Sequence, residues 1–98
     1  MTVKILLDGT NLTDRSALHD RLAQEFRFPD YYGQNLDALY DLLSALPEQV
    51  DLTVIHPDQL LEHLGNYGKS FLKTLEDASK VNKKLNLLIS FEKSENNS

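Results

Sequence analysis

Three short apolar segments, separated by longer stretches of helical pattern, constrain the fold of this 98-residue chain more than any other feature. They lie at 3–7, 52–56 and 85–91, and their β-branched and leucine side chains are typical of strands. Strands separated by helical stretches pair in parallel through right-handed crossovers. The pattern therefore predicts an α/β fold, in the order β-α-α-β-α-α-β, with a small three-stranded parallel sheet packed against about four helices.

The first apolar segment also predicts how the sheet is covered. Val3, Ile5, Leu6 and Leu7 form a nearly unbroken apolar run before the turn residues at 8–9. Runs of this kind are typical of strands that are buried on both faces. We therefore expect the first strand to be covered on both sides.

Caps and prolines mark the helices. Pro29 prevents the first helix from continuing, and Pro47 stops the second. Thr13 is the expected N-cap of the first helix and Asn35 that of the second. The expected helices run from the cap Thr13 to about Phe26, from about Asn35 to Leu46, from Pro57 to near Gly65 and from about Tyr67 to Asn82.

Composition indicates one globular domain. Apolar residues make up 41% of the chain and charged residues 26%, which is close to globular averages. We expect residues 1–93 to form this domain and residues 94–98 to be a disordered polar tail. The absence of cysteine suits a reducing compartment such as the cytoplasm. No apolar run approaches membrane-spanning length, so we expect no membrane partner.

Acidic residues are concentrated in the middle of the chain. Residues 28–68 contain seven acidic side chains and no lysine or arginine, whereas the remainder has eight acids and ten bases. Such a segment attracts cations, and a protein that binds nucleic acid is one partner of that charge. Direct binding to nucleic acid is not expected, because phosphate contacts need clustered lysine and arginine.

The expected second helix divides into two faces. At 100° per residue, Asp37, Asp41 and Ser44 fall on one side, and four leucines at 39, 42, 43 and 46 fall on the other. The leucines are the natural core face, so the aspartates point outward with Tyr40 beside them. Asp37 alone is explained by capping, because it meets the positive end of the helix dipole.

Asp41 carries a cost that favours a role for it. Aspartate in mid-helix is about 0.5 kcal/mol worse than alanine. Repulsion from Asp37 adds roughly 0.2–0.5 kcal/mol. A guanidinium or ammonium group docked between the two carboxylates would relieve that repulsion.

The loop before this helix contains two tyrosines and a glycine. We expect one tyrosine ring to pack on the edge of the core and the other to be exposed beside the acidic face, a combination found in interface centres. Gly33 is expected to supply a positive φ or a close backbone approach. His19, His56 and His63 have no metal-ligand spacing, and we expect them at the surface or at strand ends.

The string PDYYGQNLDALYDLL, at residues 29–43, resembles the loop and second helix of the barstar family of intracellular inhibitors of barnase-type ribonucleases. The likeness extends from the apolar first strand through LTVIH to LEDAS, before the last strand, and so covers nearly all residues before the tail. It implies a barstar-like fold whose loop and second helix plug a ribonuclease active site. The chain departs from the family's namesake at Tyr40, where that protein has tryptophan, at Leu46, where it has an aromatic residue, and in lacking cysteine.

The resemblance also implies roles for individual residues. Asp41 would be the central carboxylate, reaching the active-site arginines and histidine of the nuclease, while Asp37 makes a second polar contact. Tyr31 would pack against the catalytic histidine, and Asp77 would meet a basic residue at the rim. The partner-binding residues implied in this way are Tyr31, Gly33, Asn35, Leu36, Asp37, Tyr40, Asp41, Ser44 and Asp77.

These observations predict a stoichiometric inhibitor that performs no catalysis and needs neither metal nor cofactor. Its expected partner is a small basic ribonuclease of the barnase type, bound 1:1 by a monomer in the cytoplasm as toxin immunity. One alternative is an adaptor or regulator that binds a non-nuclease basic protein through the same acidic face. Another is an enzyme that uses Asp37 and Asp41 for acid–base work or metal binding, although an open helix face offers no enclosing pocket.

Overall fold

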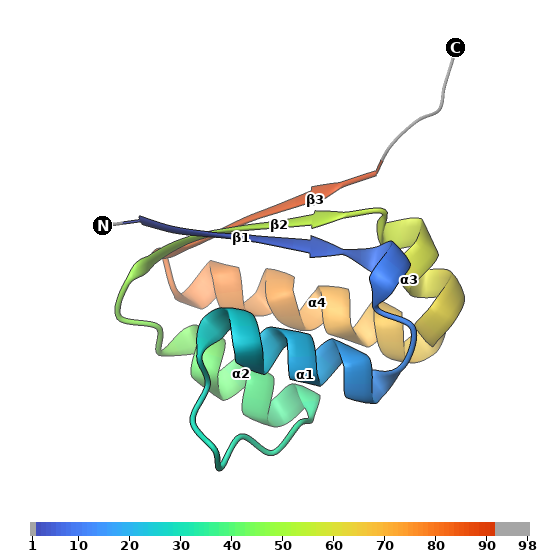
Figure 1. Ribbon diagram of the computed structural model, residues 1–98. Coiled ribbons are helices and arrows are strands. Elements are labelled where there is room, and N and C mark those ends of the chain that lie inside the picture. The colour runs from blue at the N-terminus through green and yellow to red at the C-terminus, as the bar shows by residue number, and fades with distance from the viewer. Residues whose placement is uncertain (1, 92–98) are drawn as a thin grey trace.

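The computed structural model describes residues 2–91, so the expected tail at 94–98 lies outside the described residues. Among those described, no helix is both long enough and apolar enough to cross a membrane. The chain forms the expected alternation of strands and helices (Figure 1). Its elements are β1 (Thr2–Asp8), the 3-10 turn η1 (Gly9–Asn11), α1 (Arg15–Phe26), α2 (Leu36–Ser44), β2 (Gln49–Ile55), α3 (Pro57–Leu64), α4 (Asn66–Val81) and β3 (Leu85–Ser90).

The three strands form one parallel sheet in the order β1-β2-β3, which confirms the predicted fold class. Ile5 pairs in register with Leu52, and Leu52 with Leu87. Burial alternates along β2, where Val50, Leu52 and Val54 are buried and the residues between them are partly exposed. The sheet therefore presents one apolar face to the helices.

Only one face of the sheet is covered, so the prediction of a doubly covered first strand is wrong. In Figure 1, α1, α2 and α4 lie on the same side of the sheet, and α3 lies at the end where β2 finishes. Leu6 and Leu88 point to the other side and are 52% and 60% exposed. The strand order explains this arrangement, because right-handed crossovers that progress in one direction along a sheet place their helices on one face. Helices on both faces require the order to reverse.

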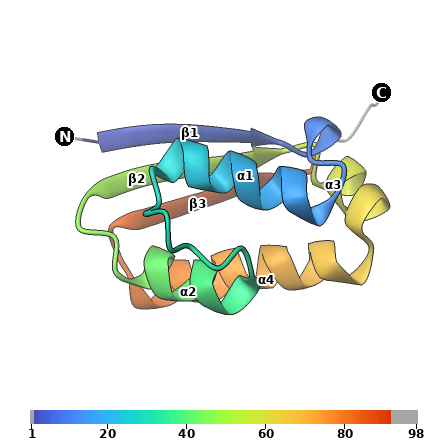
Figure 2. The same cartoon turned by 60° about the horizontal axis from the view of Figure 1, so that its bottom comes forward.

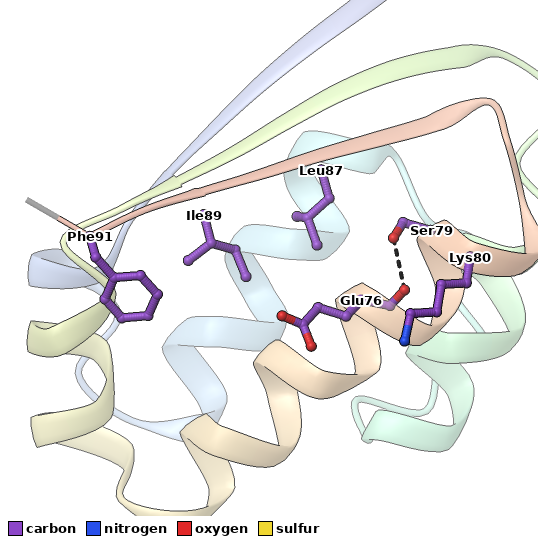
Figure 3. Close-up of a pocket in the computed structure, with 6 residues that line it drawn as sticks. All are labelled: Glu76, Ser79, Lys80, Leu87, Ile89 and Phe91. Carbon is purple, nitrogen blue, oxygen red and sulfur yellow. Dashed lines mark hydrogen bonds between the residues drawn. The ribbon is translucent and has the colours of Figure 1, made fainter.

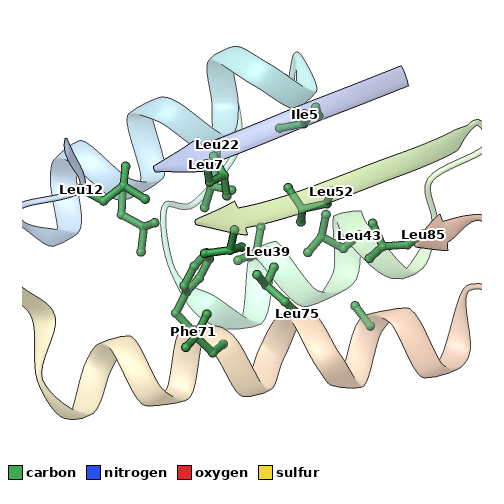
Figure 4. Packing of buried hydrophobic residues seen from close by; sticks show 14 of the residues in the cluster. Ile5, Leu7, Leu12, Leu22, Leu39, Leu43, Leu52, Phe71, Leu75 and Leu85 are labelled. Atoms are coloured by element: carbon green, nitrogen blue, oxygen red, sulfur yellow. The ribbon is translucent and has the colours of Figure 1, made fainter. Parts of the chain in front are cut away.

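The core lies between the sheet and the helices (Figure 4). Leu39 and Leu43 of α2 are fully buried there and Leu42 is partly buried, which confirms the leucine face within the helix. The expected end of this helix at Leu46 is wrong, because α2 ends at Ser44, and Leu46 is partly buried beyond that end. On α4, the predicted apolar face of Phe71, Leu75 and Ala78 is also fully buried.

Local signals set most of the helix ends. Asn35 caps α2 as predicted, with its side-chain oxygen accepting from the Ala38 N–H at 2.8 Å. The predicted cap Thr13 is wrong, because α1 begins at Arg15 and Asp14 accepts from the Ala17 N–H at 2.8 Å. Both residue types cap helices, so composition alone does not choose between neighbours.

One glycine is required by a close contact between chain segments. A Cβ on Gly9 would lie 2.1 Å from the main-chain oxygen of His56, well inside van der Waals contact. The turn after β1 therefore packs directly on the start of α3. The carboxylate of Asp8 adds a hydrogen bond to His56 Nδ1 at 2.9 Å, and this bond and the Thr10 N–H lower the pKa of Asp8.

Candidate partner-binding surface

The acidic face of α2 is exposed and unpaired. Asp37 and Asp41 both lie at the surface, and no described residue forms an ion pair or a side-chain hydrogen bond with either carboxylate. Behind them, the fully buried Leu39 and Leu43 hold the helix against the core. The helix itself contains no lysine or arginine. The two charges are therefore available to a cationic partner.

Side-chain hydrogen bonds of Asn35 hold the N-terminus of α2. Besides capping the helix, the side chain of Asn35 donates to the main-chain oxygen of Gly33 at 3.3 Å. Asp37 lies in the first turn, where its charge meets the positive end of the helix dipole. Asp41 lies one turn further on and lacks that compensation.

The loop at 28–34 presents one tyrosine and buries the next. Tyr31 is 83% exposed and Tyr32 is 9% exposed, which confirms the expected division of roles. Tyr32 packs against Phe28 with ring centroids 4.8 Å apart, and its amide donates to the oxygen of Pro29 at 2.9 Å. These contacts of Tyr32 hold the loop against the core, while the ring of Tyr31 projects into solvent.

Of the two alternatives expected at Gly33, the positive φ does not occur there but at the next residue, Gln34, which has a φ of 52°. The Gln34 side-chain amide donates to Asp20 of α1 at 2.8 Å, a bond that offsets part of the cost of this backbone conformation. Gly33 does make a close approach, since a Cβ there would lie 3.0 Å from Nδ2 of Asn35.

A buried histidine beneath the loop is the feature that the sequence prediction missed. His19 is 1% exposed, contrary to the expected surface position. Its Nδ1 lies 2.5 Å from the hydroxyl of Tyr32, and its Nε2 lies 2.6 Å from that of Tyr67 on α4. Its spacing to the buried Leu22, three residues on, was the available signal, because that spacing places both on one helix face. His56 follows a strand as expected, and His63 is exposed.

Burial controls the protonation of this cluster. Desolvation lowers the pKa of His19 from its usual value of 6.5; the nearby Arg15 adds to this effect and Asp20 opposes it. Desolvation also raises the pKa of Tyr32 and, more weakly, that of Tyr67. The imidazole and both hydroxyls are therefore neutral near pH 7.

The remaining predicted residues differ in their availability. Leu36 and Tyr40 are partly buried against the core. The hydroxyl of Ser44 is buried and has no hydrogen-bond partner among the described residues. Asp77 is half-exposed on α4, the helix that lies beside α2 in Figure 2, and forms an ion pair with Lys73 at 3.4 Å. Of the acidic residues proposed for the surface, Asp77 is thus the one already paired within the chain.

The acidic face does not coincide with a groove of about 540 Å³ that lies between α4 and β3 (Figure 3). The lining residues of the groove are Glu76, Ser79, Lys80, Leu87, Ile89 and Phe91.

Within residues 2–91, no group of three or more His, Cys, Asp or Glu side chains is arranged to hold a metal ion. What α2 and its loop offer is an exposed aromatic ring, that of Tyr31, and the two exposed carboxylates of Asp37 and Asp41.

The fold and this surface define a small α/β protein of a known family. The family model described as Barstar (barnase inhibitor) matches residues 2–92, and the chain belongs to the barstar family. A protein of Bacillus subtilis (strain 168) named "Putative ribonuclease inhibitor YrdF" is 36% identical to the chain over 77 residues, which span 76% of this chain and 84% of that protein. The family prediction made from residues 29–43 is therefore confirmed.

Proposed function

We propose that the chain is a stoichiometric inhibitor of a small cationic ribonuclease. A cytoplasmic monomer would bind the nuclease 1:1 and occlude its active site, as immunity against the enzyme's toxicity. The name of the Bacillus subtilis relative and the description of the family both support ribonuclease inhibition. No bond of the substrate is broken, because the inhibitor acts by occupying the site.

The observation that carries this proposal is the pair of unpaired carboxylates on α2. Asp37 and Asp41 are separated by one helical turn and lie on the exposed face of a leucine-backed helix. A nuclease that binds RNA phosphates has a cationic pocket, and two carboxylates can occupy it with charge-assisted hydrogen bonds. Tyr31 then supplies the exposed aromatic ring at the edge of the contact.

Titration of enzyme activity tests the proposal. A panel of small basic ribonucleases of the barnase type, including any encoded in the neighbouring reading frame, is assayed against increasing amounts of the chain. We expect the activity of one member to fall linearly to zero at one inhibitor per enzyme. Association should also slow as salt rises, because exposed opposite charges steer the encounter. A panel without any inhibited member contradicts the proposal.

Matched variants then separate docking from general attraction between charges. Asp41→Asn removes one charge from the surface, and Glu62→Gln removes one from the exposed face of α3. Charge-assisted hydrogen bonds contribute about 1.5–3 kcal/mol, so the Asp41 variant should bind roughly 10- to 140-fold more weakly. The Glu62 variant should change affinity by less than about twofold. Equal losses of affinity in the two variants would indicate nonspecific attraction between charges and not docking of α2.

An adaptor that binds basic proteins in general makes a different prediction. It would retain non-nuclease basic proteins on a column as strongly as a catalytically dead nuclease. The inhibitor should retain the nuclease alone, since the placement of Tyr31 and the carboxylates demands a matching pocket.

A further inference from the structure

The buried cluster beneath the loop joins three parts of the chain that are distant in sequence. His19 comes from α1, Tyr32 from the loop at 28–34 and Tyr67 from α4. Both nitrogens of the imidazole have a tyrosine hydroxyl as partner, at 2.5 Å and 2.6 Å. A neutral imidazole has one N–H donor and one acceptor, so one tyrosine donates to it and the other accepts from it.

Burial decides which tyrosine donates. The Tyr32 contact is buried, whereas the Tyr67 contact is partly buried. If Nδ1 carried the proton, the hydroxyl of Tyr32 would accept from it, and its own O–H would be a buried donor with no other hydrogen-bond partner among the described residues. If Nε2 carries the proton, Tyr32 donates to Nδ1, and Tyr67 accepts while its own O–H lies in a contact that is only partly buried. Only the second arrangement leaves no buried donor unpaired.

We propose that His19, held as the Nε2–H tautomer, is the positioning residue of the loop at 28–34. Its Nδ1 accepts from Tyr32 and so fixes the loop that presents Tyr31. The bond between Gln34 and Asp20 holds the far end of the same loop against α1. The consequence for nuclease binding rests on the proposed function, but the positioning itself is a property of the free chain.

Protonation of His19 would disrupt this arrangement. With a proton on both nitrogens, Nδ1 no longer accepts, and the buried hydroxyl of Tyr32 loses its acceptor. The charged groups that face the imidazole are Arg15 and Asp20, both on α1, and they act in opposite directions on its charge. Desolvation therefore remains the dominant influence, and it favours the neutral ring that the loop requires.

The tautomer is tested directly by imidazole ¹⁵N spectroscopy of the free protein at pH 7. The ring signals of His19 are assigned by their loss in His19→Gln. We expect a protonated Nε2 and an unprotonated, hydrogen-bonded Nδ1. A protonated Nδ1, or a ring that exchanges rapidly between tautomers, overturns the proposal.

Positioning is tested by amide hydrogen exchange at Tyr32, whose N–H donates to the oxygen of Pro29. Tyr32→Phe keeps the ring and removes the hydroxyl that binds His19, whereas Tyr67→Phe removes the partner on the other side. The loss of one hydrogen bond should speed exchange at residue 32 roughly 2- to 12-fold in Tyr32→Phe. Exchange there should stay at the wild-type rate in Tyr67→Phe. Equal exchange in both variants, with core amides unchanged, contradicts a positioning role.

Binding supplies the final comparison. If a nuclease is inhibited by the wild type, Tyr32→Phe should dissociate from it faster than Tyr67→Phe does. Equal dissociation rates would overturn the link to binding while leaving the proposed function intact. Conversely, failure to find an inhibited nuclease would overturn the proposed function, and the spectroscopic and exchange results would still decide the role of His19.

Discussion

Asn82 joins the ends of two helices by donating its side-chain amide to the main-chain oxygen of Leu43, 3.0 Å away. The same amide reaches the oxygen of Leu46 at 3.2 Å. The last carbonyls of a helix have no partner within it, so this side chain completes the end of α2. The helix that carries Asp37 and Asp41 is thereby fixed to α4.

Asn82→Asp should destabilise the fold, because it removes both donors and places a negative charge at the negative ends of α2 and α4. We expect the free energy of unfolding in urea to fall by about 2–3 kcal/mol. Asn66→Asp is the matched control, since it makes the same change at the first residue of α4. There the charge meets the positive end of the dipole, and stability should be unchanged or rise by about 0.3–1 kcal/mol. Similar losses in both variants would exclude a bridging role for Asn82.

Truncation of the two loop tyrosines should have different effects on the free energy of unfolding. Tyr32→Ala removes a buried ring and should cost about 3–5 kcal/mol of unfolding free energy. Tyr31→Ala removes an exposed ring, and its stability should stay within about 0.5 kcal/mol of the wild type. Binding to an inhibited nuclease should nevertheless weaken in the Tyr31 variant. Thermal or urea unfolding checks the first two expectations, and a large loss in Tyr31→Ala would mean that this ring is packed in solution.

Asp41→Ala should stabilise the free protein while it weakens binding. Alanine is the better helix former by about 0.5 kcal/mol. Loss of repulsion from Asp37 adds roughly 0.2–0.5 kcal/mol. The unfolding free energy should therefore rise by about 0.7–1 kcal/mol. Asp37→Ala should gain less, because it loses a favourable interaction with the helix dipole. A decrease in stability on changing Asp41 would show that its carboxylate is compensated within the chain.

Stability should decline on acidification through His19. The folded state lowers the pKa of this imidazole below the value of 6.5 that it has when unfolded. The contribution is therefore fully present above about pH 6.5 and is lost as the pH falls toward the folded pKa, because the unfolded state binds the proton first. The measurement is the urea midpoint between pH 5 and pH 8.

His19→Gln is the control for that pH dependence. It should be less stable than the wild type at pH 7, because glutamine cannot reproduce both bonds to the tyrosine hydroxyls. Its stability should also change less between pH 7 and pH 5. His63→Gln alters an exposed histidine and should keep the wild-type profile. An unchanged acid response in His19→Gln would assign the effect to other groups.

Patterns that act over a few neighbouring residues determine much of this protein without any contribution from tertiary structure. Strand and helix order, the cap at Asn35 and the leucine face of α2 all follow from local spacing. So do the outward placement of Asp37 and Asp41 and the choice of family from the loop and helix. These features depend on turn chemistry and helical periodicity, which one segment contains in full.

Contacts between distant segments decided the rest. The exposed faces of Leu6 and Leu88 follow from the direction in which successive crossovers progress across the sheet, which no single strand encodes. The burial of His19 required two tyrosines from the loop and α4. Burial of the Ser44 hydroxyl likewise depends on how α2 packs. Whether a polar side chain meets water or a partner depends on what another part of the chain brings to it, and only folding supplies that neighbour.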